Sequence, residues 1–287
     1  MEEVSAGHTA PAIPSEPITL MLLGGGIRFP AFIGALQAVE EKRLPIAKIV
    51  GSSSGGIIAA LYAAGMTPDD LRREAMEVDT SRFKDISLSG ILTGYGICSG
   101  NRLEAWLDEK LGGLCFADRL RWPLRIIATD MLNYKPVIFS REAFPEVKIA
   151  TAARCSVGVP WVFACRRLAS RGKKYALVDG SLMAGVIERM LERAEKTLVL
   201  KVVSKRTLNH SGTGTLNLKK YFLEMLTFTM HAQEKEFIKG GKWKDTILLY
   251  CADIPPARFN LSTKEKEYLF AQGYEQTMKY LEYKWGI

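Results

Sequence analysis

The stretch AKIVGSSSGGIIAALYAA, at residues 47–64, decides the fold because a single tight turn joins two apolar runs. The first run, residues 47–50, predicts a buried strand, and residues 57–64 predict a buried helix. Gly51 and Gly55 flank the turn, so it can be sharp enough to hold its central residue, Ser53, in a strained backbone conformation. The helix dipole behind that turn favours negative charge. We therefore expect Ser53 to be a nucleophile.

A second glycine-rich turn follows an earlier strand. Residues 18–23, ITLMLL, predict a buried parallel strand, and GGGIR follows at residues 24–28. A dinucleotide cradle would need a glycine where Phe29 stands, and a P-loop would need a lysine; the sequence has neither. Consecutive glycines instead expose main-chain N–H groups, which can hold the oxyanion of a tetrahedral intermediate. Each turn also has a purely structural explanation, as a tight turn or a helix cap.

A serine nucleophile needs a base, and the sequence contains only three histidines, at positions 8, 210 and 231. They fall in the polar start of the chain, in a loop rich in Asn, Ser and Gly, and within a predicted long helix. An aspartate can serve instead where its surroundings raise its pKa from about 3.9. Asp179 and Asp130 each follow a predicted strand, where α/β folds collect active-site loops. The residues alone do not separate these two candidates.

The rest of the chain alternates between patterns typical of strands and of helices. Further strands are predicted at residues 124–129, 136–140, 175–178, 197–203 and 246–250, and helices at residues 30–42, 67–78, 101–111, 147–153, 184–194, 216–238 and 262–280. This alternation predicts an α/β fold with a mainly parallel sheet. We expect residues 1–16 to be a flexible amino-terminal segment, residues 17–287 to form a single domain, and residues 87–100 to be a loop over the core.

Three short motifs occur in a fixed order: GGGIR at residues 24–28, GSSSG at residues 51–55 and DGS at residues 179–181. Together they resemble the patatin-like phospholipase family, whose members use a Ser–Asp dyad and a glycine-rich oxyanion loop. TDMLNYKPVIFS, at residues 129–140, is similar to a β-hairpin of that family. AARCSVGVPWVF, at residues 152–163, is similar to the stretch that leads to the dyad aspartate. The resemblance extends over residues 18–190.

The resemblance implies a three-layer α/β/α sandwich of the lysophospholipase-like type, with a mainly parallel central sheet and a single catalytic domain. It implies that Ser53 is the nucleophile and Asp179 its base, which leaves Asp130 in a structural hairpin turn. Arg28 would hold the oxyanion loop in place or act electrostatically. The residues that match this loop are Gly24, Gly25, Gly26, Ile27 and Arg28, with the amides of Gly25 and Gly26 binding the oxyanion and Ile27 beside them.

The activity that the resemblance implies is hydrolysis of lipid carboxylic esters, of the phospholipase A or lysophospholipase type, through an acyl-serine intermediate and without a metal or cofactor. The alternatives are an acyltransferase or thioesterase on the same fold, and a non-catalytic module that binds a lipid or nucleotide. The sequence departs from the family pattern at Phe29, at Ser181 and at residues 182–186. These departures concern the shape of the acyl pocket and remove no catalytic group.

Composition indicates the partners and the compartment. The net charge of +8 favours anionic partners, and basic clusters occur at residues 166–174 and 201–206. No nucleic-acid recognition motif accompanies them, so we expect a phospholipid or lysophospholipid substrate, transient contact with an anionic membrane surface, and no nucleic acid. Five cysteines without metal-type spacing, and no apolar leader, predict a cytoplasmic protein, peripheral at the membrane, that holds no metal. An unidentified activator would act through residues 87–100.

Overall fold

The structure is a computed structural model that describes residues 16–87, 91, 95–183, 196–203, 221, 225, 228, 245–252, 254–256, 258 and 260–287. The helix predicted at residues 184–194 lies outside these residues, as does nearly all of the helix predicted at residues 216–238. Residues 1–15 of the expected amino-terminal segment and the three histidines also lie outside them.

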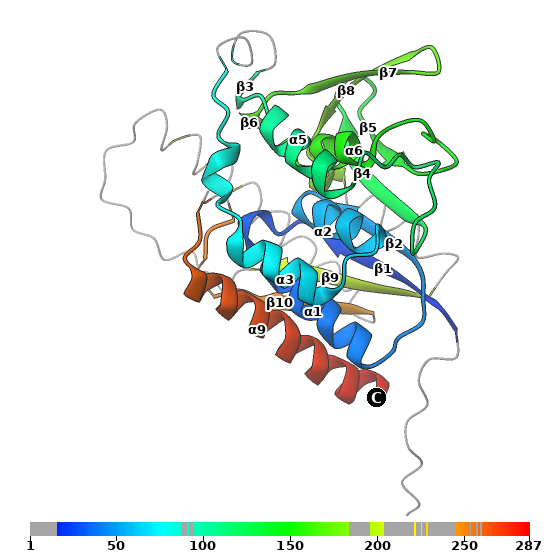
Figure 1. The fold of residues 1–287 in the computed structure, drawn as a ribbon, viewed down its shortest axis with the longest axis vertical. Coiled ribbons are helices and arrows are strands. Elements are labelled where there is room, and N and C mark those ends of the chain that lie inside the picture. Colours follow the sequence, from blue (N-terminus) through cyan, green and yellow to red (C-terminus); the bar gives the residue numbers. More distant parts are fainter. Residues whose placement is uncertain are drawn as a thin grey trace, which may run out of the picture.

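One eight-stranded sheet organises the protein, with the strand order β10-β9-β1-β2-β4-β8-β7 and with β5 paired to β4 (Figure 1). The pairs from β10 to β4 are parallel, whereas β5 and β8 run antiparallel to β4, and β7 runs antiparallel to β8. This confirms the predicted α/β fold with a mainly parallel sheet. The strands are β1 (Ile18–Leu23), β2 (Ile46–Ser52), β4 (Leu124–Asp130), β5 (Lys135–Phe139), β7 (Arg166–Ser170), β8 (Lys173–Val178), β9 (Thr197–Val203) and β10 (Thr246–Tyr250).

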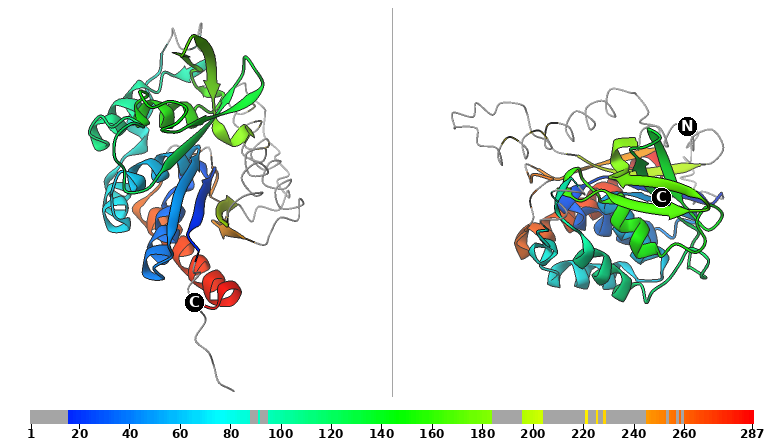
Figure 2. Two further views of the ribbon diagram at one scale, coloured as in Figure 1. Left: turned by 90° about the vertical axis from the view of Figure 1, so that its right-hand side faces the viewer. Right: turned by 90° about the horizontal axis from the view of Figure 1, so that it is seen from above.

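The described α-helices cover one face of this sheet (Figure 2). They are α1 (Pro30–Glu41), α2 (Ser54–Ala63), α3 (Pro68–Glu77), α5 (Asn101–Lys110), α6 (Ile149–Ser156) and α9 (Thr263–Tyr280). The main hydrophobic core fills the space between these helices and the sheet. Among the described residues, no helix has the length and apolar character needed to cross a membrane.

Local signals set most element boundaries. Helix α3 begins with a capping box between Thr67 and Asp70, and α9 with one between Ser262 and Glu265. Strand β1 is buried along its whole length, so its apolar run alone predicts the observed bounds. The patterns did not predict β7 or the small two-stranded sheet formed by β3 (Gly96–Cys98) and β6 (Trp161–Phe163). Strand β3 lies within residues 87–100, which were expected to be a loop.

The topology brings the sequence motifs to one edge of the sheet. Strands β1 and β2 are adjacent and parallel, with Leu23 opposite Ser52, so the glycine loop and the serine turn leave the sheet side by side. Strand β8 joins the end of β4, with Val178 opposite Thr129. Asp179, the next residue, is thereby carried to the carboxyl ends of the parallel strands, where α/β folds place ligands.

Candidate active site

Ser53 occupies the turn between β2 and α2 in a backbone conformation that few non-glycine residues adopt, with φ 53° and ψ −136°. Two neighbouring glycines permit so tight a turn. A Cβ atom on Gly51 would lie 2.6 Å from the Cα of Gly56, and one on Gly55 would overlap the main chain of Leu22 in β1. The turn therefore holds Ser53 in a fixed, strained position at the amino end of α2.

The Ser53 hydroxyl donates a hydrogen bond of 2.8 Å to Oδ2 of Asp179. Both residues are buried, with 4% of Ser53 and 2% of Asp179 exposed. The other carboxylate oxygen, Oδ1, accepts hydrogen bonds from the amide and hydroxyl of Ser181, at 2.8 and 2.5 Å. The main-chain carbonyl of Asp179 accepts a bond from the Thr129 hydroxyl at 2.8 Å. The carboxylate is thus fixed on one side and faces Ser53 on the other.

The electrostatic surroundings suit Asp179 to accept a proton. Burial disfavours its charged form and raises its pKa above the ordinary value of 3.8. The hydrogen bonds from Ser181 and Ser53, and the positive charge of Lys201, oppose this rise without cancelling it. A carboxylate with a raised pKa is a stronger base than an exposed one, which is what a serine hydroxyl requires.

Asp130, the other candidate, serves a local structure. Its carboxylate accepts hydrogen bonds from the Leu132 amide at 3.0 Å, from the Asn133 side chain and from the Ala176 amide at 3.2 Å. Although burial acts to raise the pKa of Asp130, these bonds outweigh it and the pKa is lowered. The structure therefore brings Asp179 to Ser53 and leaves Asp130 holding the turn between β4 and β5.

The glycine loop turns back beside Ser53 through three residues with positive φ: 71° at Gly24, 107° at Gly25 and 58° at Gly26. The Gly24 amide donates to the carbonyl of Ser52 at 3.2 Å, and the Ile27 amide donates to the carbonyl of Pro256 at 3.0 Å. Among the described residues, the amides of Gly25 and Gly26 have no acceptor. Of the amides in the predicted oxyanion loop, those of Gly24 and Ile27 already donate within the protein. The candidates for binding an oxyanion are therefore the amides of Gly25 and Gly26.

Two side chains hold this loop in place. The buried guanidinium of Arg28 donates from Nε to the carbonyl of Gly25 at 3.1 Å. Ser54, next to the nucleophile candidate, donates from Oγ to the carbonyl of Gly24 at 2.9 Å. Both bonds occupy carbonyl groups of the loop, whereas the amides of Gly25 and Gly26 have no acceptor among the described residues.

Sequence reasoning gave no role to Ser156, at the end of α6. The main-chain amide of Ser53 donates to Ser156 Oγ at 2.8 Å, and that hydroxyl donates in turn to the carbonyl of Ile127 in β4 at 2.6 Å. A hydroxyl can make both bonds at once, since it both accepts and donates. Ser156 lies in the quoted stretch 152–163, but no local pattern marks it as a partner of Ser53.

Lys201 is a second residue that was not predicted for the site, although it began one of the basic clusters. It lies in β9, opposite Leu23 of β1, and only 7% of it is exposed. Its Nζ lies 3.6 Å from the position that a Cβ atom on Gly24 would occupy. A lysine in the otherwise uncharged and mostly apolar strand TLVLKVV is the signal that could have indicated it.

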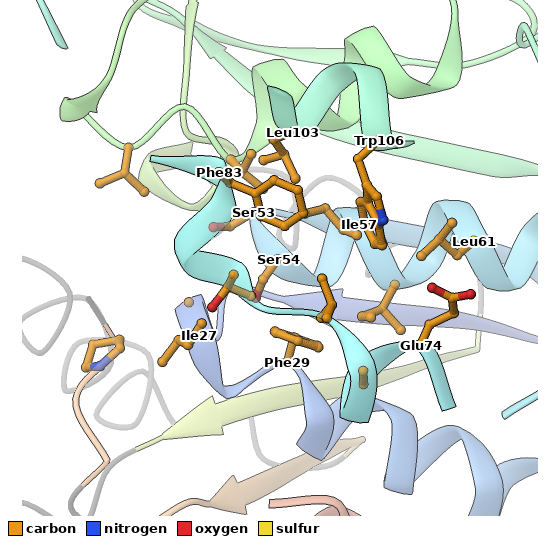
Figure 3. Close-up of a pocket in the computed structure, with 18 of the residues that line it drawn as sticks. Ile27, Phe29, Ser53, Ser54, Ile57, Leu61, Glu74, Phe83, Leu103 and Trp106 are labelled. Carbon is orange, nitrogen blue, oxygen red and sulfur yellow. The ribbon is translucent and has the colours of Figure 1, made fainter. Parts of the chain in front are cut away.

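An apolar cavity of about 180 Å³ opens beside Ser53 (Figure 3). Ile27, Ser54 and Phe83 line its part near the nucleophile candidate, and Leu61, Trp106 and Glu74 line the far part. Among the described residues that line the cavity, Glu74 is the one acidic residue, and its carboxylate is paired with Lys110 at 2.6 Å. A cavity of this shape accepts an apolar chain with its reactive end at Ser53.

These features can be compared with known proteins. The sequence model described as patatin-like phospholipase matches residues 20–191, more than half of the chain. The chain belongs to this family. Family membership makes it a lipid-hydrolysing enzyme with a patatin fold, as the sequence resemblance implied.

Individual proteins similar to this chain extend the comparison. Uncharacterized protein YqhO of Bacillus subtilis is 24% identical over 282 residues, which cover 90% of this chain and 96% of that protein. Probable lipid hydrolase 463L of invertebrate iridescent virus 6 is 25% identical over 159 residues, covering 50% of this chain and 54% of that protein. The crystal structure of VipD from Legionella pneumophila superposes with a TM-score of 0.65 and 17% identity, covering 93% of this chain and 67% of VipD. VipD therefore shares the fold.

Proposed function

We propose that this patatin-like protein is a serine acyl hydrolase of the phospholipase A or lysophospholipase type, with Ser53 as nucleophile and Asp179 as its base. The observation that carries the proposal is the 2.8 Å hydrogen bond from Ser53 Oγ to the buried Asp179 carboxylate. The name of the viral relative, probable lipid hydrolase 463L, supports the substrate class.

The first half of the reaction acylates the enzyme. Ser53 Oγ attacks the ester carbonyl carbon of the lipid while its proton passes to Asp179 Oδ2. The carbonyl oxygen becomes an oxyanion, to which the amides of Gly25 and Gly26 donate; each such donor contributes about 3–4 kcal/mol to the transition state. The intermediate then collapses, and the alcohol leaves with the proton that Asp179 accepted. An acyl-Ser53 ester remains.

The second half releases the fatty acid. A water molecule attacks the acyl carbonyl carbon, and its proton passes to Asp179. The same two amides stabilise the second oxyanion. When this intermediate collapses, Ser53 Oγ regains a proton from Asp179, and the carboxylic acid departs. The cycle therefore begins and ends with a protonated serine and an ionised aspartate, and it consumes one water per ester.

The cavity supports a lipid substrate. Its walls are almost entirely aliphatic and aromatic. Each methylene of a fatty acyl chain that is buried there would therefore favour binding by about 0.8 kcal/mol. Because Ser53 and Ser54 line the same cavity, the carboxyl end of that chain would lie at the nucleophile. An apolar acyl group is favoured over a polar one.

Labelling with a fluorophosphonate, which reacts covalently with activated serines, tests the assignment. We expect the wild type to be labelled, Ser53→Ala to show no labelling, and Asp179→Asn to be labelled at least a hundredfold more slowly. Asp130→Asn is the matched control, because it changes the other candidate aspartate, and it should retain labelling at the wild-type rate.

Hydrolysis of phospholipid and lysophospholipid, measured as released fatty acid, should change in the same way as labelling in each of these variants. Labelling that survives Ser53→Ala would overturn the nucleophile assignment. If Asp130→Asn and Asp179→Asn lost labelling and hydrolysis to the same extent, with both variants folded by circular dichroism, the case for Asp179 as the base would be removed.

A further inference from the structure

Large apolar side chains are exposed at the end of the protein that carries the small β3–β6 sheet. Ile86 is 74% exposed, Tyr95 71%, Ile97 49% and Trp161 47%. An aromatic or aliphatic side chain on its own is common at a protein surface, but a group of them beside a cavity marks an interaction site. We call these four residues the β3–β6 face.

The four residues are neighbours in space although they are distant in the sequence. Ile86 forms an isolated bridge with Cys98 of β3, and β3 pairs with β6 so that Gly96 lies opposite Trp161. Tyr95 and Ile97 flank Gly96 in the chain. The exposed side chains of the β3–β6 face therefore surround one small unit of two short strands, with Ile97 on the opposite side of that unit from Trp161 and Ile86.

The same strands form part of the cavity wall. Val162 and Phe163 of β6 line the cavity, while the preceding residue, Trp161, belongs to the exposed face. Phe83 lines the cavity as well, three residues before the exposed Ile86. The β3–β6 face therefore lies on the outer side of the part of the cavity wall that β6 and Phe83 form.

A buried arginine fixes this unit to the rest of the site. Arg154 of α6 donates from Nη2 to the carbonyl of Ser99 at 2.7 Å and to the carbonyl of Ala164 at 2.8 Å. Those residues directly follow β3 and β6. Since α6 also carries Ser156, which accepts the Ser53 amide, the β3–β6 face is anchored to the helix that holds the nucleophile candidate.

Positive charge lies at the same end of the protein. Strand β7 begins three residues after β6, and β7 pairs with β8 to form a projecting hairpin at the top of Figure 1. The exposed cations of this hairpin are Arg167, Arg171, Lys173 and Lys174. The nearby Arg166 is instead paired with Glu104 at 3.1 Å.

We propose that the β3–β6 face and the β7–β8 hairpin together dock on the surface of an anionic phospholipid bilayer; this inference rests on the proposed function. Aromatic and aliphatic side chains enter the interfacial region of a bilayer, and lysines and arginines near it are attracted by anionic head groups. A protein partner would have to match this surface in shape, whereas a bilayer requires only apolar side chains and cations at the same end of the protein. Docked this way, the protein takes an acyl chain into the cavity without carrying it through water.

Vesicle binding of the Ser53→Ala protein tests the apolar part, because that background removes hydrolysis from the measurement. The variant Tyr95→Asn/Trp161→Asn removes two exposed rings at positions with φ 58° and 64°, where asparagine is among the best-tolerated side chains. We expect partitioning onto vesicles of phosphatidylcholine and phosphatidylglycerol to fall by about tenfold for each ring removed. Tyr268→Asn/Tyr283→Asn is the matched control, since it removes one exposed ring from α9 and one from the residues that follow α9, and should leave partitioning unchanged.

The charged part has its own test. Changing Arg167, Lys173 and Lys174 to glutamine should lower partitioning onto phosphatidylglycerol-containing vesicles by about a hundredfold, at roughly fivefold per cation. Partitioning onto pure phosphatidylcholine should change little, and added salt should abolish the difference between wild type and variant. The sensitivity to salt separates attraction by the head groups from a general loss of structure.

The outcomes separate docking from catalysis. With Ser53 restored, the ring and cation variants should hydrolyse a short soluble ester at the wild-type rate and lose activity only on vesicles. Unchanged vesicle partitioning in both variants would overturn the proposal, even if Ser53→Ala abolishes hydrolysis. A change of oligomeric state in the ring variant, with partitioning intact, would assign the face to a second copy of the chain instead.

Discussion

The main-chain amide of Ser53 donates a 2.8 Å hydrogen bond to the side-chain oxygen of Ser156, a residue 103 positions later in the sequence. The strained turn thereby gains a contact outside its own strand and helix. Because Ser156 Oγ is also bonded to the carbonyl of Ile127, the position of the turn is fixed relative to β4. We infer that Ser156 is a positioning residue for Ser53.

Replacing Ser156 with alanine should lower kcat about 10- to 100-fold and leave KM nearly unchanged, because the nucleophile loses its alignment while the acyl cavity keeps its walls. Steady-state hydrolysis of a soluble ester measures both constants. Thr151→Ala is the matched control: it removes another hydroxyl from α6, one bonded to Glu104, and should preserve kcat. A rise in KM with an unchanged kcat would contradict a positioning role.

The buried charge of Asp179 should cost stability. Because burial raises its native pKa above 3.8, the native state holds this proton more tightly than the unfolded chain does. Stability therefore falls as the pH rises from the unfolded pKa through the native pKa, and the full cost remains above that window. We expect Asp179→Asn to abolish hydrolysis and to raise the melting temperature by a few degrees at neutral pH.

Asparagine suits this test because its carbonyl oxygen can accept both bonds from Ser181, while its amide can donate to Ser53 Oγ. Calorimetry at several pH values makes the comparison. The two proteins should converge as the pH falls below the native pKa of Asp179, since the carboxyl is then neutral in the wild type as well. A variant less stable than the wild type at every pH would show that the carboxylate is favourable where it lies.

The hydroxyl of Ser181 should set the acid limit of the activity. It donates to Asp179 Oδ1 and lowers the pKa of that carboxyl. Ser181→Ala removes this bond, so the pKa of Asp179 should rise further above its ordinary value. Since catalysis needs the ionised carboxylate, kcat/KM should fall at low pH and be retained at high pH. Ser181→Thr, which keeps a hydroxyl, should follow the wild-type profile, and an unmoved acid limb in Ser181→Ala would rule out this role.

The sequence predicted the elements whose signals are local. The apolar runs of β1, β9 and β10 gave their observed bounds because β1 and β9 are buried along their whole length and β10 is largely buried, so none of them needs an alternation of polar residues. Strands β3 and β6 carry no such signal, since each has three residues and its partner lies more than 60 positions away. Their pairing depends on Arg154 and on the cavity side chains, which no window of sequence contains.

The site was predictable to the same degree. The serine turn follows from Gly51 and Gly55, whose place between a strand and a helix is visible in the sequence. The residues left Asp130 and Asp179 equivalent, because both follow strands, and only the family resemblance favoured Asp179. The structure shows the physical difference: the amides of Leu132 and Ala176 donate to the carboxylate of Asp130, whereas one oxygen of Asp179 accepts a hydrogen bond from Ser53. Such a difference depends on tertiary contacts.

The cavity should make hydrolysis depend on acyl chain length up to a limit. An engineered protein cavity of about 150 Å³ holds benzene, so the 180 Å³ beside Ser53 encloses an alkyl segment of about seven carbons. For soluble esters, kcat/KM should rise about fourfold with each methylene, at about 0.8 kcal/mol per methylene buried, and level off near eight carbons. Beyond that length, additional carbons remain outside the enclosed part and contribute no further burial.

Trp106 should set that limit, because its ring lines the far part of the cavity and packs 5.3 Å from the ring of Phe83. Trp106→Ala should enlarge the enclosed space and move the plateau of kcat/KM to chains several carbons longer, with little change for the shortest esters. Trp122→Ala is the matched control, since the ring of Trp122 packs against that of Tyr62, with 4.5 Å between the ring centroids, and is not among the described residues that line the cavity. If kcat/KM were independent of chain length in the wild type, the acyl chain would bind elsewhere; a plateau unmoved by Trp106→Ala would place the end of the chain before that ring.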